Sequence, residues 1–230
     1  MSKKIYLSPS EQTKNTYAYG NTNEATQCGK IAEAARAALE RNGFEVMLGH
    51  YMTMAQKCAE SDAFGADAHI PIHTNACNGE VTGTRLFSYS LSGEGYELCK
   101  SIFNQLAPLT PGKSESISAQ PQLYEVRTPK APTAYIEVEF HDNAAAAQWI
   151  VEHTDEIGEA IARGVCDYFG VPFLKKEDAR DNAPDAYAVE AINWAVDKGI
   201  LKGDDTGNYM LHSEVTRQDM LVFLYRALCQ

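Results

Sequence analysis

Two histidines stand four residues apart in the segment HIPIHTNA, residues 69–76. Alternation along a strand places the side chains of His69 and His73 on one face, opposite the apolar residues of the segment. Four strand residues span roughly 13 Å, so the two imidazoles are too far apart to bind the same metal ion. His73 comes last before a polar loop, and it is therefore either a metal ligand or a hydrogen-bonded residue at a strand end.

Carboxylates from two other parts of the chain can complete a site with His73. Glu24 opens an expected helix, where the helix dipole alone favours an acid. Glu137 and Glu139 share one face of the apolar segment TAYIEVEF, where burial is costly unless a cation is near, either an arginine such as Arg85 or a metal ion. Zinc binds imidazole and carboxylate, and a second carboxylate can deprotonate its water. Glu24, His73 and Glu137 therefore form a candidate hydrolytic zinc site, with the structural alternatives open.

The elements that would position these residues alternate along the chain. Strands are expected at residues 3–7, 44–48, 68–73, 84–90 and 133–140, and helices at residues 23–43, 54–66, 93–106 and 144–170, the last with a break near Thr154. Residues 108–122 contain three prolines and several serines, and are expected to form a long loop. This order predicts an α/β fold with a mostly parallel sheet and polar strand ends gathered at one edge.

The C-terminal part of the chain reads as a separate module. Residues 174–185 are charged and poor in large apolar groups, which is typical of a linker between domains at 1–173 and 186–230. Two helical segments follow, and Thr216 with Asp219 forms a candidate capping box. About 45 residues bury little surface alone, so we expect this helical module to dock or to associate with copies of itself.

Composition excludes several classes of function. The formal net charge of −11 argues against nucleic acid or an anionic membrane surface as the main partner. No window approaches the roughly 20 apolar residues of a spanning helix, and the first ten residues lack the apolar region of a secretory signal. The six cysteines show no CxxC spacing, so we expect free thiols rather than a zinc ribbon.

Several segments between residues 4 and 169 resemble the zinc-dependent N-acetylmuramoyl-L-alanine amidases, especially the branch of clostridia and phage endolysins. They are NEATQCGKIAEAARAALERNGFEV, GADAHIPIHTNACNGEVTGTRLF, LYEVRTPKAPTAYIEVEFHDN and the helix that follows. The family motif SIHxNA is matched by PIHTNA, and E-x-G-F-x-x-N is matched by EVEFHDN except that Glu139 replaces the glycine, so Glu139 is not expected to be the base. The resemblance implies a twisted, mostly parallel six-stranded sheet flanked by helices.

The resemblance also implies an activity and the residues that perform it. The reaction is hydrolysis of the amide between N-acetylmuramic acid and L-alanine of the peptidoglycan stem peptide, by a zinc-activated water. Glu24 and His73 would be zinc ligands, and Glu137 would be the catalytic glutamate. Asn75 and Arg127 lie in the resembling segments, and we expect them to bind substrate.

The first histidine ligand of the family is missing from this chain. The family carries its first histidine ligand in DPGHGG after the first strand, whereas this chain reads SPSEQT, with Glu11 at the histidine position. We expect Glu11 to replace the histidine as a zinc ligand. The alternatives are that Gln12 moves into this place, that His50 or His69 fills the gap, or that zinc is no longer bound. In the last case the chain would be a non-catalytic wall-binding protein on an amidase fold.

The last 40 residues resemble one S-layer homology motif. The resemblance is carried by W-A-x-x-K-G-I, V-T-R-x-x-M and the final L-Y-R. It implies attachment to a secondary cell-wall polymer, or association between copies of the chain. With no recognisable signal peptide, we expect the protein to be made in the cytoplasm and to reach the wall after release, as an endolysin or autolysin does, or by non-classical export.

Overall fold

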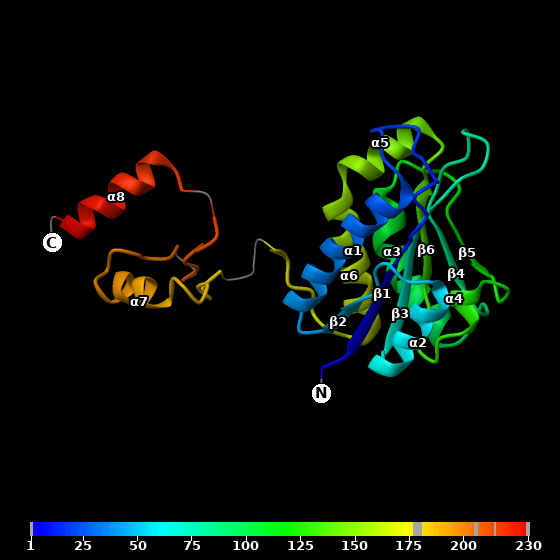
Figure 1. The fold of residues 1–230 in the computed structure, drawn as a ribbon, viewed down its shortest axis with the longest axis horizontal. Helices are drawn as coiled ribbons and strands as arrows, with labels where there is room; N and C mark the ends of the chain where they lie inside the picture. Colours follow the sequence, from blue (N-terminus) through cyan, green and yellow to red (C-terminus); the bar gives the residue numbers. More distant parts are fainter. Residues whose placement is uncertain (1, 177–180, 205–206, 214, 229–230) are drawn as a thin grey trace. The chain divides into compact units, whose positions relative to one another are not determined.

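The computed structural model describes residues 2–176, 181–204, 207–213 and 215–228 (Figure 1). The chain divides into two compact units, the first ending at Leu174 and the second beginning at Lys175. Residues 177–180, in the middle of the predicted linker, lie outside the described residues. None of the described helices combines the length and the apolar character needed to cross a membrane. All candidate site residues belong to the first unit.

Six strands of the first unit form one sheet in the order β2-β1-β3-β6-β4-β5. The strands are β1 (Lys4–Pro9), β2 (Glu45–Leu48), β3 (Ala68–Asn75), β4 (Arg85–Ser88), β5 (Ser116–Ala119) and β6 (Tyr135–Phe140). β4 pairs antiparallel with β6, and every other neighbouring pair is parallel. The prediction of a mostly parallel six-stranded α/β sheet is confirmed.

Helices connect the strands and cover both faces of the sheet. They are α1 (Glu24–Arg41), α2 (Met54–Phe64), α3 (Glu94–Leu106), α4 (Tyr124–Arg127), α5 (Ala144–Glu152) and α6 (Thr154–Phe169), with a 3₁₀ turn at Ala107–Leu109. The predicted break near Thr154 is confirmed, because α5 ends one residue before His153 and α6 begins one residue after it. The prediction of a plain loop at residues 108–122 is wrong in part, since β5 pairs there with β4 at the sheet edge.

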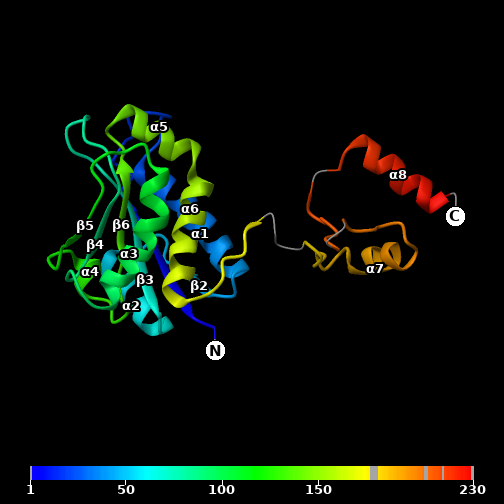
Figure 2. The same cartoon turned by 180° about the vertical axis from the view of Figure 1, so that it is seen from behind.

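The two faces of the sheet differ in character. Helices α1, α3 and α6 cover one face, and α2 and α4 lie against the other (Figures 1 and 2). The first face holds the main core, in which Ile5, Leu7, Ile70 and Ile72 are fully buried beneath the helices. Because strand side chains alternate, the second face carries the polar and aromatic residues of the same strands, including the two histidines of β3.

Close contact between helices of the core face depends on small residues. Gly164 of α6 lies directly against α3, where an added Cβ would come 2.8 Å from the Ile102 nitrogen and 2.9 Å from the Ser101 oxygen. Gly158 packs in the same way against Ala34 of α1. A side chain at either position would force the helices apart.

The second unit contains α7 (Val189–Asp197) and α8 (Arg217–Leu228). The predicted capping box at the start of α8 is confirmed, since Thr216 N donates to Asp219 Oδ2 (3.0 Å) and Asp219 N donates to Thr216 Oγ1 (3.2 Å). Among the described residues of the two helices none is buried, and Trp194 and Tyr225 are exposed. Docking or association of this module stays a prediction.

Replacing Gly164 by alanine tests the close packing of α6. We expect Gly164→Ala to lower the free energy of unfolding by about 1–3 kcal/mol, because the new methyl group overlaps the backbone of α3. Gly29→Ala on α1 is the matched control, since its Cβ would meet only His50 Cε1 at 3.6 Å. It should raise the free energy of unfolding by about 0.5–1 kcal/mol by restricting the unfolded chain. Urea denaturation measures both, and equal effects would contradict the packing argument.

Candidate active site

Two carboxyl groups and one imidazole meet near the ends of the parallel strands β3 and β6, where α1 begins. β3 presents His73 and β6 presents Glu137, and these two residues are direct partners in the β3–β6 register. Glu24 is the first residue of α1, whose N-cap, Asn23, accepts a hydrogen bond from Thr26 N. The Glu24 Oε1 atom lies 2.9 Å from His73 Nδ1. The three residues proposed from spacing and resemblance are therefore brought together, from elements more than 45 residues apart.

The Glu24 carboxylate is buried and held by several donors. Its side chain is 1% exposed, and Asn15 Nδ2 donates to its Oε2 atom at 2.6 Å. Burial by itself raises the pKa of Glu24, but hydrogen bonds from His73, Asn15 and Ser10 outweigh it, and the pKa lies below its usual range. Glu24 is therefore an anion at neutral pH, oriented toward the imidazole.

Glu137 has a different environment and therefore a different proton affinity. Its Oε2 atom is enclosed and has no hydrogen-bond partner within the described residues. Burial, and then the nearby Glu24 carboxylate, raise the pKa of Glu137 to about 7, although His73 opposes this effect. Two neighbouring carboxyl groups with pKa values moved in opposite directions are typical of hydrolytic sites.

The imidazole of His73 is packed and supported from behind. Its ring stacks on Tyr135, with 4.7 Å between ring centroids and 16° between planes. The next residue, Thr74, lies in a buried network in which its Oγ1 atom is 2.9 Å from the Tyr17 hydroxyl and 3.0 Å from His141 Nδ1. These contacts fix the end of β3, and sequence analysis singled out neither Tyr17 nor His141.

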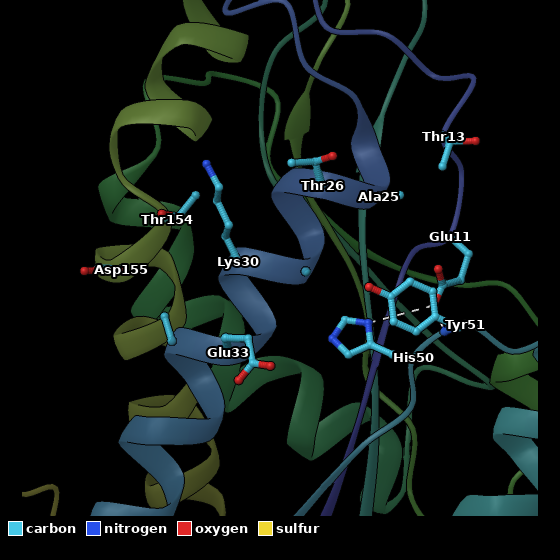
Figure 3. A pocket seen from close by; sticks show the side chains of 12 residues that line it. Glu11, Thr13, Ala25, Thr26, Lys30, Glu33, His50, Tyr51, Thr154 and Asp155 are labelled. Carbon is cyan, nitrogen blue, oxygen red and sulfur yellow. Dashed lines mark hydrogen bonds and ion pairs between the residues drawn. The ribbon is translucent and has the colours of Figure 1, made fainter.

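Glu11 faces a different part of the surface from the one predicted. Its Oε1 atom accepts a hydrogen bond from Tyr51 N (2.6 Å) and lies 3.5 Å from Lys57 Nζ and 3.9 Å from His50 Nδ1. Figure 3 shows Glu11 turned toward His50 and Tyr51, at a hollow of about 700 Å³ beside α1. The structure does not bring this carboxylate to Glu24 and His73, because the loop after β1 directs it toward residues 49–57.

Gln12 occupies the place expected of Glu11. Its Nε2 atom lies 3.5 Å from Glu24 Oε1 and 3.4 Å from His73 Nδ1. Asn15 Nδ2 donates to Gln12 Oε1 at 3.0 Å, which turns the NH₂ group of Gln12 toward the carboxylate. Sequence analysis weighed Gln12 only as an alternative, and it did not include Asn15. The spacing of these polar residues in one loop was the signal that could have pointed to them.

Asn75 and Arg127, predicted to bind substrate, lie in different places. Asn75 ends β3, two residues after His73, and its Oδ1 atom accepts from Ala76 N (2.9 Å). Arg127 is exposed at the end of α4, lies over the Tyr124 ring at 5.4 Å and lines another hollow, with Tyr89 among its lining residues. Asn75 is thus adjacent to the cluster, whereas Arg127 makes its described contacts elsewhere.

Glu139 is bound by backbone N–H groups and not by an arginine side chain among the described residues. Its Oε2 atom accepts hydrogen bonds from Gly83 N (2.7 Å) and Phe140 N (2.9 Å). Arg85 instead donates to Ser114 and Ser116. Glu139 therefore anchors the loop before β4 and takes no part in the cluster.

Comparison with known protein families identifies the part of the chain that contains this cluster. The family model described as N-acetylmuramoyl-L-alanine amidase matches residues 5–167, which include Gln12, Glu24, His73 and Glu137. The chain belongs to this amidase family. The S-layer homology domain model matches residues 181–221, which belong to the second unit. A sequence search among curated proteins found no match.

Solved structures share the fold of the first unit of the amidase. The N-acetylmuramoyl-L-alanine amidase AmiC2 of Nostoc punctiforme aligns with a TM-score of 0.66 and 20% identity, over 73% of this chain and 97% of that one. The catalytic domain of CwlV from Bacillus (Paenibacillus) polymyxa gives 0.67 and 17%, over 75% and 100%. The catalytic domain of the CD27L endolysin targeting Clostridia difficile gives 0.60 and 22%, over 73% and 97%. At these identities the likeness concerns the fold.

Members of the family are typically zinc-dependent, and the cluster offers two of the ligand types that zinc prefers. One imidazole nitrogen and one carboxylate oxygen 2.9 Å apart are suitable zinc ligands. The unpartnered oxygen of Glu137, beside a second carboxylate, also calls for a cation or a water in this space. Gln12 stands at the third position and offers only a neutral amide, so the residues fit zinc with two strong protein ligands.

Replacing Gln12 by histidine tests which residue stands at the third position. We expect Gln12→His to tighten zinc binding about tenfold or more, equivalent to about 1.4 kcal/mol, because imidazole is a stronger zinc ligand than a carboxamide. Glu11→His is the matched control and should leave affinity unchanged or lower, since that side chain faces Tyr51 and Lys57. Competition with a chromophoric chelator measures both. Tighter binding in Glu11→His alone would reverse the assignment.

Removing the carboxyl group of Glu137 should change how the stability of the metal-free protein depends on pH. The pKa of Glu137 is about 7 in the folded protein and 4.5 in the unfolded chain. Between these values the folded protein binds this proton more tightly than the unfolded chain does, so the free energy of unfolding falls as pH rises. Urea midpoints measured in chelator should therefore fall more steeply from pH 5 to pH 7 in the wild type than in Glu137→Gln. Parallel curves for the two proteins would contradict the raised pKa.

Proposed function

We propose that this amidase is a zinc-dependent peptidoglycan hydrolase that cleaves the amide between N-acetylmuramic acid and L-alanine of the stem peptide. The observation that carries the proposal is the convergence of Glu24, His73 and Glu137 at one strand edge, within the segment that matches the amidase family. A carboxylate, an imidazole and a carboxyl group of raised pKa are suited to amide hydrolysis, which needs both an activated water and a proton donor.

Two of the three residues would bind the metal ion, and the third would transfer the proton. Glu24 and His73 would hold the ion, with Gln12 beside them. When bound, zinc polarises a carbonyl group and lowers the pKa of a water molecule. Glu137, with a pKa of about 7, accepts a proton from the attacking water and returns it to the nitrogen of the leaving L-alanine. Asn75, which lies two residues beyond His73, is placed to bind substrate at the edge of the site.

A non-catalytic wall-binding protein on the same fold is the second candidate function. Gln12 favours it, since a neutral amide at the third position weakens the site for zinc. Such a protein would still use the surfaces of both units to bind peptidoglycan. A protein of this kind would bind no zinc and would not digest cell walls.

The second unit suggests where the enzyme acts. Because residues 181–221 match the S-layer homology model, we propose that this unit attaches the amidase to a secondary cell-wall polymer, or pairs copies of the chain. Exposed apolar side chains such as Trp194 and Tyr225 support a partner for this unit. We also propose that the protein acts on the wall after release from the cytoplasm, as an endolysin or autolysin does.

Digestion of purified walls tests the reaction directly. We expect the wild-type chain with added zinc to release stem peptides with a free L-alanine amino terminus, identified by mass spectrometry. Glu137→Gln should lower the rate by about 10²–10⁴-fold, because the proton transfer is lost while the ligands remain. Glu40→Gln, at the opposite and exposed end of α1, is the control and should keep the wild-type rate.

Three outcomes of this digestion separate the candidate functions. Free amino termini that depend on Glu137 support the amidase. Walls that bind the protein but stay undigested, even with zinc added, support the wall-binding protein. Cleavage at another bond would exclude the proposed substrate linkage while keeping a hydrolase.

A further inference from the structure

A second group of side chains suited to metal binding lies on the same face of the sheet, away from the active site. It consists of Cys58 of α2, His69 of β3 and Glu125 of α4. One ligand atom from each lies within 4.8 Å of the other two. His69 is four residues before His73 on β3, roughly 13 Å along the strand, so the two groups cannot share one ion.

All three residues are enclosed, and their polar atoms are poorly satisfied. His69 is fully buried, and neither of its ring nitrogens has a hydrogen-bond partner within the described part of the chain. Its Nε2 atom lies 3.5 Å from Glu125 Oε1, which is otherwise bonded to Ser8 Oγ (2.5 Å). A buried imidazole whose only recorded polar neighbour among the described residues is a carboxylate 3.5 Å away has room for a further partner between the two groups. Cys58, 2% exposed, supplies the sulfur atom on the third side.

The separation between His69 and Glu125 suits a tetrahedral ion, and the imidazole ring is held in place. In a zinc site with N, O and S ligands, neighbouring ligand atoms are about 3.3–3.6 Å apart, as follows from bond lengths of about 2.0–2.3 Å. The present separation of 3.5 Å between His69 and Glu125 already meets this requirement. The His69 ring is also fixed, because it stacks on Tyr6 with 5.2 Å between centroids and 6° between planes.

Charge balance favours a bound metal ion over the His69–Glu125 pair alone. Without a metal, the buried Glu125 carboxylate has the His69 imidazole and the Ser8 hydroxyl to offset the loss of water, and a buried pair of this kind costs free energy. A divalent cation with one thiolate, one carboxylate and one neutral imidazole gives a net charge of zero. The thiol proton leaves to solvent when the metal–sulfur bond forms.

The helices on this face bury few apolar side chains, and polar contacts such as the one from Tyr6 OH to Glu60 Oε2 (2.6 Å) attach α2 to β1. The buried residues of α2 are Lys57, Cys58 and Ser61, of which only the cysteine is apolar, and α4 is a single turn. Apolar burial therefore contributes little to holding these helices on the sheet. A metal bound between α2, β3 and α4 would link all three elements.

We propose that Cys58, His69 and Glu125 form a structural zinc site, separate from the active site. Thiolate and imidazole select zinc over harder cations such as magnesium or calcium. The fourth position would be taken by a water molecule, while the Ser8 hydroxyl donates a hydrogen bond to the Glu125 ligand. The site would hold α2 and α4 against β1 and β3, the strands that lead to Gln12 and His73.

Cobalt substitution in the full-length chain tests this site through its sulfur ligand. After metal removal, added Co²⁺ should produce the near-ultraviolet charge-transfer absorption of a thiolate–cobalt bond. Cys58→Ser should abolish this absorption. Cys28→Ser is the matched control and should retain it, although Cys28 is also a buried thiol and lies one turn after Glu24 on α1. No absorption in the wild type, absorption that survives in Cys58→Ser, or its loss in Cys28→Ser would overturn the proposal.

A second measurement does not depend on the folding of the cysteine variant. In His73→Ala, which removes a ligand of the active site, we expect about one zinc per chain to remain. X-ray absorption at the zinc edge should then show one sulfur neighbour at about 2.3 Å. A shell of nitrogen and oxygen alone, or no retained zinc, would overturn the site. Neither readout uses wall digestion, so failure of this proposal is distinguishable from failure of the proposed amidase activity.

Discussion

The contact between the Glu24 carboxylate and the His73 imidazole is the interaction on which the geometry of the active site depends. A carboxylate that is 1% exposed loses its water and must be compensated within the protein. The compensation comes from His73 at the end of β3 and from Asn15 in the loop after β1. Because each donor belongs to a different segment, the anion holds the first helix, the first loop and the third strand at one point. Parallel pairing supplies the rest, since β1, β3 and β6 lie side by side and their carboxyl ends meet at one edge of the sheet.

Gln12 changes the character of the site without changing its charge, because a neutral amide replaces a neutral imidazole. The strong nitrogen donor is lost, and an NH₂ group directed at Glu24 and His73 is gained. That group can donate a hydrogen bond to the carboxylate when no cation is present. The polar face of the sheet contains two buried groups, this one at the carboxyl ends of β3 and β6 and the Cys58–His69–Glu125 group between α2, β3 and α4.

The sequence by itself determined the α/β class, the residues at the strand ends and the order of the strands and helices of the first unit other than β5 and α4. Apolar periodicity is a local property, and it predicted α1, β3 and β6 because packing reinforced what each segment already favoured. β5 was missed because Ser116–Ala119 is short and has one large apolar side chain, within a segment rich in proline and serine, and backbone pairing with β4 makes it a strand. Motif spacing likewise pointed to Glu24, His73 and Glu137, since those residues lie on regular elements.

Tertiary structure alone decided which side chain of SPSEQT faces the site. Glu11 and Gln12 are adjacent in a loop, so no periodicity separates them, and the direction of each depends on contacts with Tyr51, Lys57 and Asn15. The approach of Glu125 to His69 was equally hidden, because β4, α3 and β5 all lie between them along the chain. Side-chain direction in loops and contacts between distant elements follow from the packed fold, whereas local sequence patterns encode only the elements themselves.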